Sequence, residues 1–426
     1  MIIKKYKNLN QRKRLVLGII LLFILLLTPL YFFVLAENNI DNKQQILSTI
    51  SKHKQEEEIN PIQKCFSLPE GRDACYFNLC EKENPYLCAE DLLESTVKIS
   101  GPEQAMEALN DMMASSLFGI ASGHQLAHII GKTTSHHYGL NIEAFLRCTP
   151  DFNFGCQHGF FEDILTIQND PVKVALEICE SAPQKPYLDK FYCYHGMGHG
   201  FMLVASYHLK DALSLCDQLP TLQTQNACYE GVFMENEDGF SEGIRLEEMG
   251  FTKDDVLAPC NRVEDKYRNE CYGEHGVYIM QHSNLSIRDA SLVCLEAGDY
   301  TQECINSLAV LAIAFGWHEL LRGSFEGTPA ETTAYLCSQF LPEYIEVCQI
   351  IAISNMLNKD RTDIQMKMNA PDFCLAFQNN TSDCFKIIGA ELFEFTQDHN
   401  EVIRGCNKAP EEYRESCYEG GGITIR

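Results

Sequence analysis

Apolar residues recur at helical spacing through most of the chain, and short polar stretches separate the apolar segments. In residues 172–179 and 211–216, apolar side chains lie three and four positions apart, and a cysteine ends each segment. A second cysteine then begins another apolar run, as in residues 228–234 and 271–278. This spacing is typical of amphipathic helices joined by short loops, so it predicts an all-α protein built from antiparallel helix hairpins.

The cysteines repeat together with the helices. There are 20 of them, and so many cysteines in an even number favour an oxidising compartment over the reducing cytosol. The members of a pair are 8 to 14 residues apart. Because a short loop at a helix end brings its flanks within the roughly 7 Å that a disulfide needs, we expect sequential bonds that staple consecutive hairpins. The eight expected pairs are Cys148–Cys156, Cys179–Cys193, Cys216–Cys228, Cys260–Cys271, Cys294–Cys304, Cys337–Cys348, Cys374–Cys384 and Cys406–Cys417.

The first four cysteines look like a shortened version of the same repeat. Two pairings fit them: Cys65–Cys75 with Cys80–Cys88, which follows the repeat, and Cys65–Cys88 with Cys75–Cys80, which fits a small hairpin. Residues 90–147 contain no cysteine but keep helical periods, so a hairpin without a staple fits there.

Glycine recurs three residues after several second cysteines, at Gly159, Gly196, Gly231 and Gly420. A glycine inside a helix costs about 1 kcal/mol relative to alanine, so we expect close helix approach in return. This architecture resembles Sel1-like and tetratricopeptide repeats, especially secreted cysteine-rich members in which a disulfide links successive hairpins. For residues 61–426 the resemblance implies a right-handed α-solenoid, with the first helices of neighbouring units side by side. Such arrays are mostly binding scaffolds.

The N-terminal region predicts export from the cytoplasm. A basic segment at residues 1–14 precedes an uncharged apolar run at 15–36, which is about long enough to span a bilayer as a helix. The basic residues before this run place the N-terminus in the cytoplasm, and a polar spacer at 37–60 then leads to an extracytoplasmic domain. We favour an uncleaved anchor in the cell membrane; the alternative is a signal peptide cleaved after Val34-Leu35-Ala36, which would make the protein secreted.

The formal charge of -25 narrows the possible partners. A surface this acidic repels phosphate backbones and anionic lipid headgroups, so nucleic-acid binding is excluded as a function. The sequence contains no CxxC pair, P-loop, dinucleotide fingerprint, GxSxG or HExxH motif. The candidate functional residues therefore have to be sought outside these motifs.

Histidines concentrate between residues 120 and 240, where they recur with helical spacing. Three segments place a histidine and a second metal-ligating residue four positions apart, on one face of a helix. Their counterparts in successive repeats should line up along neighbouring helices. The resulting candidate metal ligands are His124, His128, His158, Glu162, His195, His199 and Glu230, with Glu235 as a candidate general base.

Two other interpretations of these residues are a buried polar network without metal and coincidence. The convergence of histidine and glutamate from successive repeats resembles the logic of HEAT-repeat di-iron hydroxylases. That family repeats a His-Glu dipeptide, which occurs here only at His318-Glu319, so no catalytic residue is carried over. We expect His136 and His137 to be solvated, His208 to lie outside the site and His275 to be peripheral.

Two functions remain as hypotheses. The first is a membrane-tethered metal-dependent hydrolase or oxygenase that acts on a small molecule or peptide with a divalent transition metal, Zn, Fe or Mn. The second is a non-enzymatic scaffold for a protein or envelope ligand, or a metal-binding delivery protein.

Overall fold

The computed structural model describes residues 61–424 apart from residues 82–83, 114–119, 183–186, 242–248, 253–254, 284, 322–327, 359–373 and 378–380. The segments predicted at 1–14, 15–36 and 37–60 lie outside the described residues. None of the described helices is long and apolar enough to cross a membrane.

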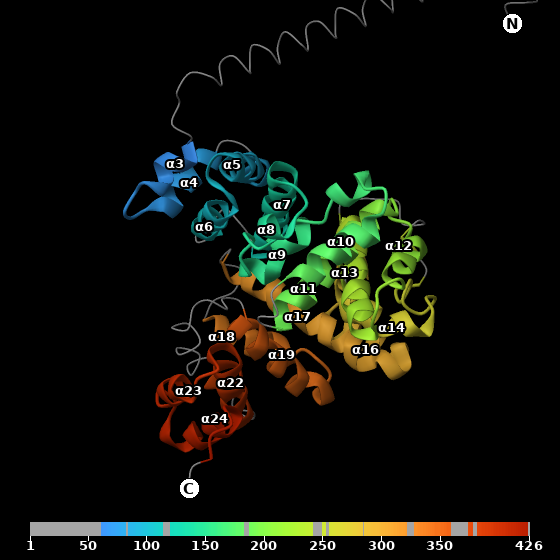
Figure 1. The fold of residues 1–426 in the computed structure, drawn as a ribbon. Helices are drawn as coiled ribbons and strands as arrows, with labels where there is room; N and C mark the ends of the chain where they lie inside the picture. The colour runs from blue at the N-terminus through green and yellow to red at the C-terminus, as the bar shows by residue number, and fades with distance from the viewer. Residues whose placement is uncertain are drawn as a thin grey trace, which may run out of the picture. The chain divides into compact units, whose positions relative to one another are not determined.

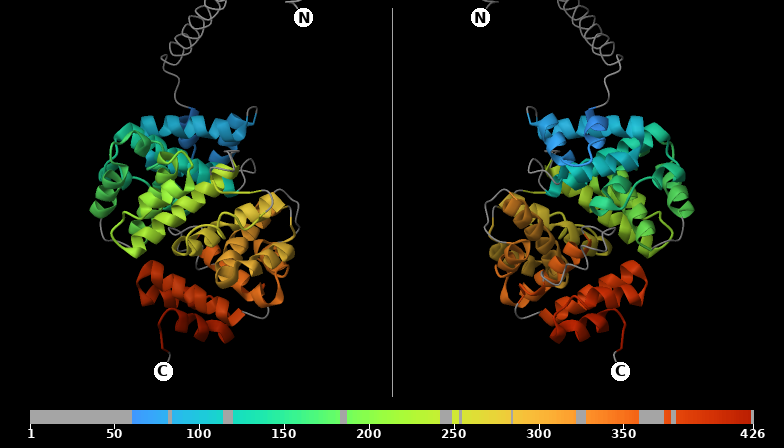
Figure 2. Two further views of the ribbon diagram at one scale, coloured as in Figure 1. Left: turned by 90° about the vertical axis from the view of Figure 1, so that its right-hand side faces the viewer. Right: turned by 90° about the vertical axis from the view of Figure 1, so that its left-hand side faces the viewer.

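The described chain is helical and has no strand beyond one isolated bridge between Thr252 and Asp255 (Figure 2). Its N-terminal α-helices are α3 (Pro61–Phe66), α4 (Arg72–Cys80), α5 (Pro85–Ser100), α6 (Pro102–Met113), α7 (Ile120–Tyr138), α8 (Ile142–Phe145), α9 (Asp151–Gly159), α10 (Pro171–Ser181), α11 (Tyr187–Val204), α12 (Leu209–Cys216) and α13 (Leu222–Ser241). The following α-helices are α14 (Asp265–Glu274), α15 (Gly276–Ser283), α16 (Ile287–Cys294), α17 (Thr301–Leu321), α18 (Pro329–Cys337), α19 (Ile345–Asn358), α22 (Thr381–Thr396), α23 (His399–Cys406) and α24 (Arg414–Gly420). Four short 3-10 helices are η1 (Ile164–Ile167), η2 (Leu295–Tyr300), η3 (Pro342–Tyr344) and η4 (Glu411–Tyr413).

Local sequence explains where several of these helices begin. Asp170 caps α10 by accepting a hydrogen bond from the backbone N–H of Lys173, and Pro171 then occupies the first helical position. Thr328 and Glu331 form a reciprocal capping box at the start of α18. These caps satisfy backbone donors that the first helical turn leaves without partners, so α10 and α18 have defined starting points.

All ten disulfides follow the sequential pairing predicted from the repeat, including Cys65–Cys75 and Cys80–Cys88 among the first four cysteines. The bonded Cα atoms lie 5.4–5.7 Å apart, within the ordinary range for disulfides. Each of the eight repeat disulfides therefore links consecutive hairpins, and the cysteine-free hairpin expected in residues 90–147 consists of α6 and α7.

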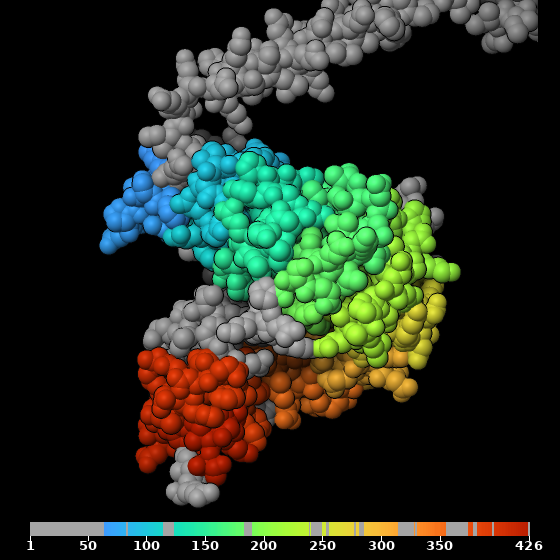
Figure 3. All heavy atoms as spheres, in the orientation of Figure 1, coloured from blue at the N-terminus to red at the C-terminus, as the bar shows by residue number. Residues whose placement is uncertain are grey.

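The longer helices pack one against the next in chain order. Contacts join α5 to α7, α7 to α9, α9 to α11, α11 to α13 and α13 to α14, and they continue through α17, α19, α22 and α24 (Figure 1). Shorter helices such as α10 and α12 complete the hairpins. A contact between α7 and α17 shows that packing is not limited to neighbouring hairpins. The segment from α7 to α11 forms a closely packed surface in the space-filling view (Figure 3).

Glycines bring the helices of this row into backbone contact. A Cβ atom on Gly131 of α7 would lie 1.9 Å from the Cys156 carbonyl oxygen, and one on Gly159 of α9 would lie 2.1 Å from the His128 carbonyl oxygen. Between α11 and α13, a Cβ atom on Gly231 would lie 1.9 Å from the carbonyl oxygen of His195. The expected close approach is confirmed, and it occurs directly beside the candidate histidines.

Candidate metal centre

Four successive helices of the row supply the predicted site residues. Helix α7 carries His124 and His128, α9 carries His158, α11 carries His195 and His199, and α13 carries Glu230 and Glu235. Glu162 lies in the turn that follows α9.

The five imidazole rings meet in one cluster, which we call the five-histidine centre. Contacting rings have centroids 4.5–5.5 Å apart. His158 lies between the histidine pair of α7 and the histidine pair of α11. Its ring centroid is 5.2 Å from that of His124 and 4.5 Å from that of His195. Four of the five histidines are buried and His124 is half-buried; the exposed fractions of His158 and His199 are 1% and 0%. The five histidines predicted from the sequence as metal ligands therefore lie together in the structure.

The α7 pair directs two nitrogens at each other. Nδ1 of His124 faces the carbonyl oxygen of Phe152 at 2.7 Å, and because a carbonyl only accepts, Nδ1 carries the proton. Nδ1 of His128 faces Oε1 of Glu162 at 2.5 Å and donates to that carboxylate. The two Nε2 atoms lie 3.0 Å apart, and both are bare lone pairs when both rings are neutral. Facing lone pairs repel, and a cation bound by both would remove that repulsion.

The α11 pair repeats this arrangement. Nδ1 of His199 lies 2.9 Å from Oε2 of Glu235, and Nδ1 of His195 lies 3.6 Å from Oε1 of Glu230. The Nε2 atoms of the two histidines face each other at 3.2 Å. Metal-binding histidines ordinarily use one nitrogen for the metal and donate the other N–H to a carboxylate or carbonyl, which fixes the ring. His124, His128 and His199 have this outer arrangement, whereas Nδ1 of His195 is buried without a hydrogen-bond partner.

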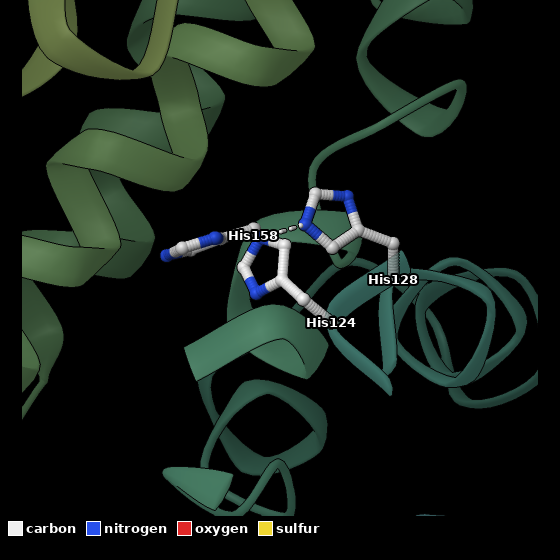
Figure 4. Close-up of side chains that lie close together, drawn as sticks. All are labelled: His124, His128 and His158. Carbon is white, nitrogen blue, oxygen red and sulfur yellow. Dashed lines mark hydrogen bonds between the residues drawn. The ribbon is translucent and has the colours of Figure 1, made fainter. Parts of the chain in front are cut away.

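His158 differs from the other four rings because neither of its nitrogens has a hydrogen-bond partner, although both are buried. A buried polar atom without a partner costs about 1–3 kcal/mol, so this ring is destabilising as a purely structural residue. In the close-up the His158 ring is seen nearly edge-on, with one nitrogen on the side of His124 and His128 and the other directed away from them (Figure 4). The ring thus has two free coordination positions.

Burial keeps three of the imidazoles neutral. It lowers the pKa of His124 to about 3. Burial and the neighbouring histidines likewise hold the pKa values of His158 and His199 well below the usual histidine value. Since a metal binds the unprotonated nitrogen, these three rings can bind a cation at neutral pH.

Three groups within the described residues bring ligand atoms within 4.8 Å of one another. They are His124, His128 and His158; His158, His195 and His199; and His128, Glu162 and His199. Donor type and spacing therefore fit a transition-metal ion, and a buried His/Glu cluster that could hold one is present.

The glutamates mainly orient the histidines. Besides its contact with His128, Glu162 lies 3.3 Å from Nζ of Lys132 through its second oxygen. Burial opposes ionisation of Glu162, but His128 and Lys132 outweigh it and hold its pKa below the usual range. The second oxygen of Glu235 accepts a 2.6 Å hydrogen bond from the Tyr207 hydroxyl. The roles of Glu162 and Glu230 as ligands and of Glu235 as a base stay predictions.

Three further histidines, His136, His208 and His275, belong to none of the groups that could hold a metal ion. His136 is exposed, and His208 is exposed with Nδ1 2.9 Å from the Ala205 carbonyl oxygen. His275 is buried and occupied on both sides, by Glu237 at 2.9 Å and by the Val256 carbonyl oxygen at 2.7 Å. The side chain of His318 lies outside the described part of the structure.

Sequence reasoning missed the groups that hold the ligands. Phe152 presents its carbonyl to His124 from a run of three left-handed residues, 152–154, which no glycine announces. Lys132 and Tyr207 are polar residues without a distinctive motif. Their positions depend on helix packing, so the sequence alone carried no signal for them.

No protein-family model, curated protein or solved structure matches this chain.

Proposed function

We propose that this chain is a metalloprotein whose five-histidine centre binds a divalent transition metal. One observation carries the proposal: His158 is buried between two histidine pairs with both nitrogens unpartnered. A polar core without metal would be expected to pair these atoms, since nearly all buried polar groups in proteins have a partner.

The donor set also bears on which metal is bound. Imidazole suits Zn, Cu, Fe and Ni, whereas carboxylate and water ligands suit Mn, Mg and Ca. Because the inward-facing donors are imidazoles, Zn and Fe fit better than Mn among the ions expected from the sequence. A bound ion would supply Lewis acidity for the activation of water or dioxygen, so hydrolase and oxygenase are the proposed reaction classes.

A surface cleft with a volume of about 300 Å³ lies beside the outer residues of the centre and is lined by residues that include Lys132, His136 and Asp163. Lys132 contacts Glu162, which contacts His128. We propose that a small molecule or a peptide end binds in this cleft.

Metal storage or delivery is the second candidate. The near-complete burial of His158, His195 and His199 favours it, because a site that only retains an ion needs no open coordination position. Such a protein would bind metal stoichiometrically and show no turnover. A non-enzymatic scaffold for a protein or envelope ligand would need neither bound metal nor turnover.

The proposed setting is extracytoplasmic. Ten disulfides and the absence of free cysteines among the described residues support an oxidising compartment. With residues 15–36 as an anchor in the cell membrane, the domain at 61–426 would be a right-handed α-solenoid held at the membrane surface. The solenoid part of this proposal is supported by the contacts between each longer helix and the next one along the chain.

The test is the metal content of full-length protein, loaded with Zn(II) or Fe(II), desalted and measured by mass spectrometry. At least one ion per chain is expected. Replacing both His195 and His199 by asparagine should lower the content, whereas replacing the exposed His208 should not. Clearly substoichiometric metal after loading would contradict the proposal. Unchanged partner binding by the double variant would favour the scaffold function.

A further inference from the structure

The five-histidine centre contains two halves that have the same design. In each half, a helix presents two histidines four residues apart, and their Nε2 atoms face each other. Outer oxygens of Phe152, Glu162 and Glu235 lie within hydrogen-bond distance of Nδ1 of His124, His128 and His199, whereas the nearest carboxylate oxygen to Nδ1 of His195 is that of Glu230 at 3.6 Å.

The distances within each pair fit ligands of a single ion. With metal–nitrogen bonds of about 2.0–2.1 Å, two imidazole nitrogens on one ion lie roughly 2.9–3.4 Å apart, depending on whether the angle between them is square or tetrahedral. The Nε2 atoms lie 3.0 Å apart in the α7 pair and 3.2 Å apart in the α11 pair. Each pair is therefore already spaced as a chelate for its own ion.

One ion does not account for both pairs. The groups of ligand atoms that come within 4.8 Å of one another, in the part of the chain that the structure describes, never contain both complete pairs. His158 instead belongs to one group with His124 and His128 and to another with His195 and His199. It is the shared member, and both of its nitrogens are buried and unpartnered.

We propose that the centre is dinuclear, with one transition-metal ion on each histidine pair and the ring of His158 bridging the two ions through its two nitrogens. The inference rests on the proposed function. One ion takes its third ligand from the His158 nitrogen on the side of the α7 pair, and the other takes its third ligand from the second nitrogen. Because a bridging ring has a metal on both nitrogens, the N–H proton of His158 leaves to solvent when the second ion binds.

The competing arrangement is a single ion on His128, Glu162 and His199, the group that takes one residue from each pair. It would leave His124, His158 and His195 without a metal. It would also depend equally on both helices, so removal of either pair would abolish binding. The two arrangements therefore make opposite predictions for variants that lack one pair.

The experiment measures Zn(II) bound per full-length chain in the wild type, in a double variant with His124→Asn and His128→Asn, and in a second with His195→Asn and His199→Asn. The proposal expects two ions in the wild type and one in each double variant. His208→Asn, at an exposed histidine, is the matched control and should keep two. Retained disulfides and helical content establish that each variant is folded.

The outcomes separate this inference from the proposed function. A wild type with one ion, lost in both double variants, would overturn the dinuclear centre and leave the metalloprotein proposal standing. A wild type with none would overturn both. Two ions in the wild type but none in either double variant would overturn the assignment of one ion to each pair.

The bridge itself is tested with Cu(II) in place of Zn(II). Two Cu(II) ions joined by one imidazole ring couple magnetically, so the electron paramagnetic resonance signal should be well below two spins per chain. In His158→Ala the coupling should disappear, and any bound copper should give its full signal. A full two-spin signal in the copper-loaded wild type would overturn the bridge.

Discussion

Substituting Gly231 by alanine tests whether backbone contact between helices holds the centre together. The added Cβ atom would lie 1.9 Å from the His195 carbonyl oxygen and 3.2 Å from the Cα atom of Gly198. Both neighbours are backbone atoms and cannot rotate away, so α11 and α13 must separate by more than about 1 Å, given ordinary carbon–oxygen contacts of roughly 3.2 Å or more. The histidine pair on α11 moves with its helix.

The expected magnitude combines two opposing effects. Alanine favours the helical state over glycine by about 1 kcal/mol, whereas forcing extra atoms into a packed contact costs about 1–3 kcal/mol and occasionally more. Because the contact at Gly231 is far shorter than most overpacked sites tolerate, we expect a net loss of about 2 kcal/mol in the free energy of unfolding. Gly273 in α14 is the matched control, since a Cβ atom there meets nothing within 4 Å. Gly273→Ala should stabilise by about 0.5–1 kcal/mol.

The assay is guanidinium unfolding of both variants with their disulfides intact, followed by titration of each with Zn(II). Gly231→Ala should unfold at lower denaturant and bind zinc more weakly than Gly273→Ala. Equal midpoints for the two variants would refute the reasoning that close backbone approach positions the histidines.

Three further predictions concern the outer ligands, the staples and pH. Glu235→Gln should weaken metal binding about 10- to 100-fold without changing the number of ions, because the carboxylate orients His199 rather than binding the metal; unaltered affinity in a zinc competition titration would argue against that role. Replacing Cys216 and Cys228 by serine, which opens a staple with a sequence separation of 12, should cost about 3 kcal/mol in denaturant unfolding, and a loss below about 1 kcal/mol would contradict it. In metal-free protein, the pKa of His124 is lowered to about 3, so between pH ~6.5 and about 3 the unfolded chain binds more protons than the folded one. The free energy of unfolding therefore falls on acidification through this window, by up to about 1.4 kcal/mol per pH unit for each such ring. Unfolding midpoints measured in chelator that stay constant from pH 7 to 5 would be inconsistent with neutral buried imidazoles.

The helical repeat could be predicted because its signals are local. Helical periodicity and cysteine spacing specify where hairpins begin and end, and sequential pairing follows from loop length, so the eight repeat disulfides agree with the prediction. For the first four cysteines two pairings were open, and the structure has the one that follows the repeat. The glycines after second cysteines, such as Gly159 and Gly231, indicated close packing because an otherwise costly residue recurred in register.

The detailed site could not be predicted in the same way. Counting from the cysteines placed His158, His195 and Glu230 in one row, but it could not tell an inward ligand from an outward partner. That distinction depends on ring orientation, which the left-handed turn at Phe152 and the contacts of Glu162 and Glu235 determine. The shared position of His158 depends in turn on the approach of three helices.

X-ray absorption by the metal bound to full-length protein tests the central claim most directly. The account predicts a first shell of nitrogen or oxygen atoms at about 2.0–2.1 Å for zinc, with the outer-shell scattering of several imidazole rings, and the loss of part of that imidazole scattering in His158→Ala. A first shell that contains sulfur, or one of oxygen atoms without imidazole scattering, would contradict it.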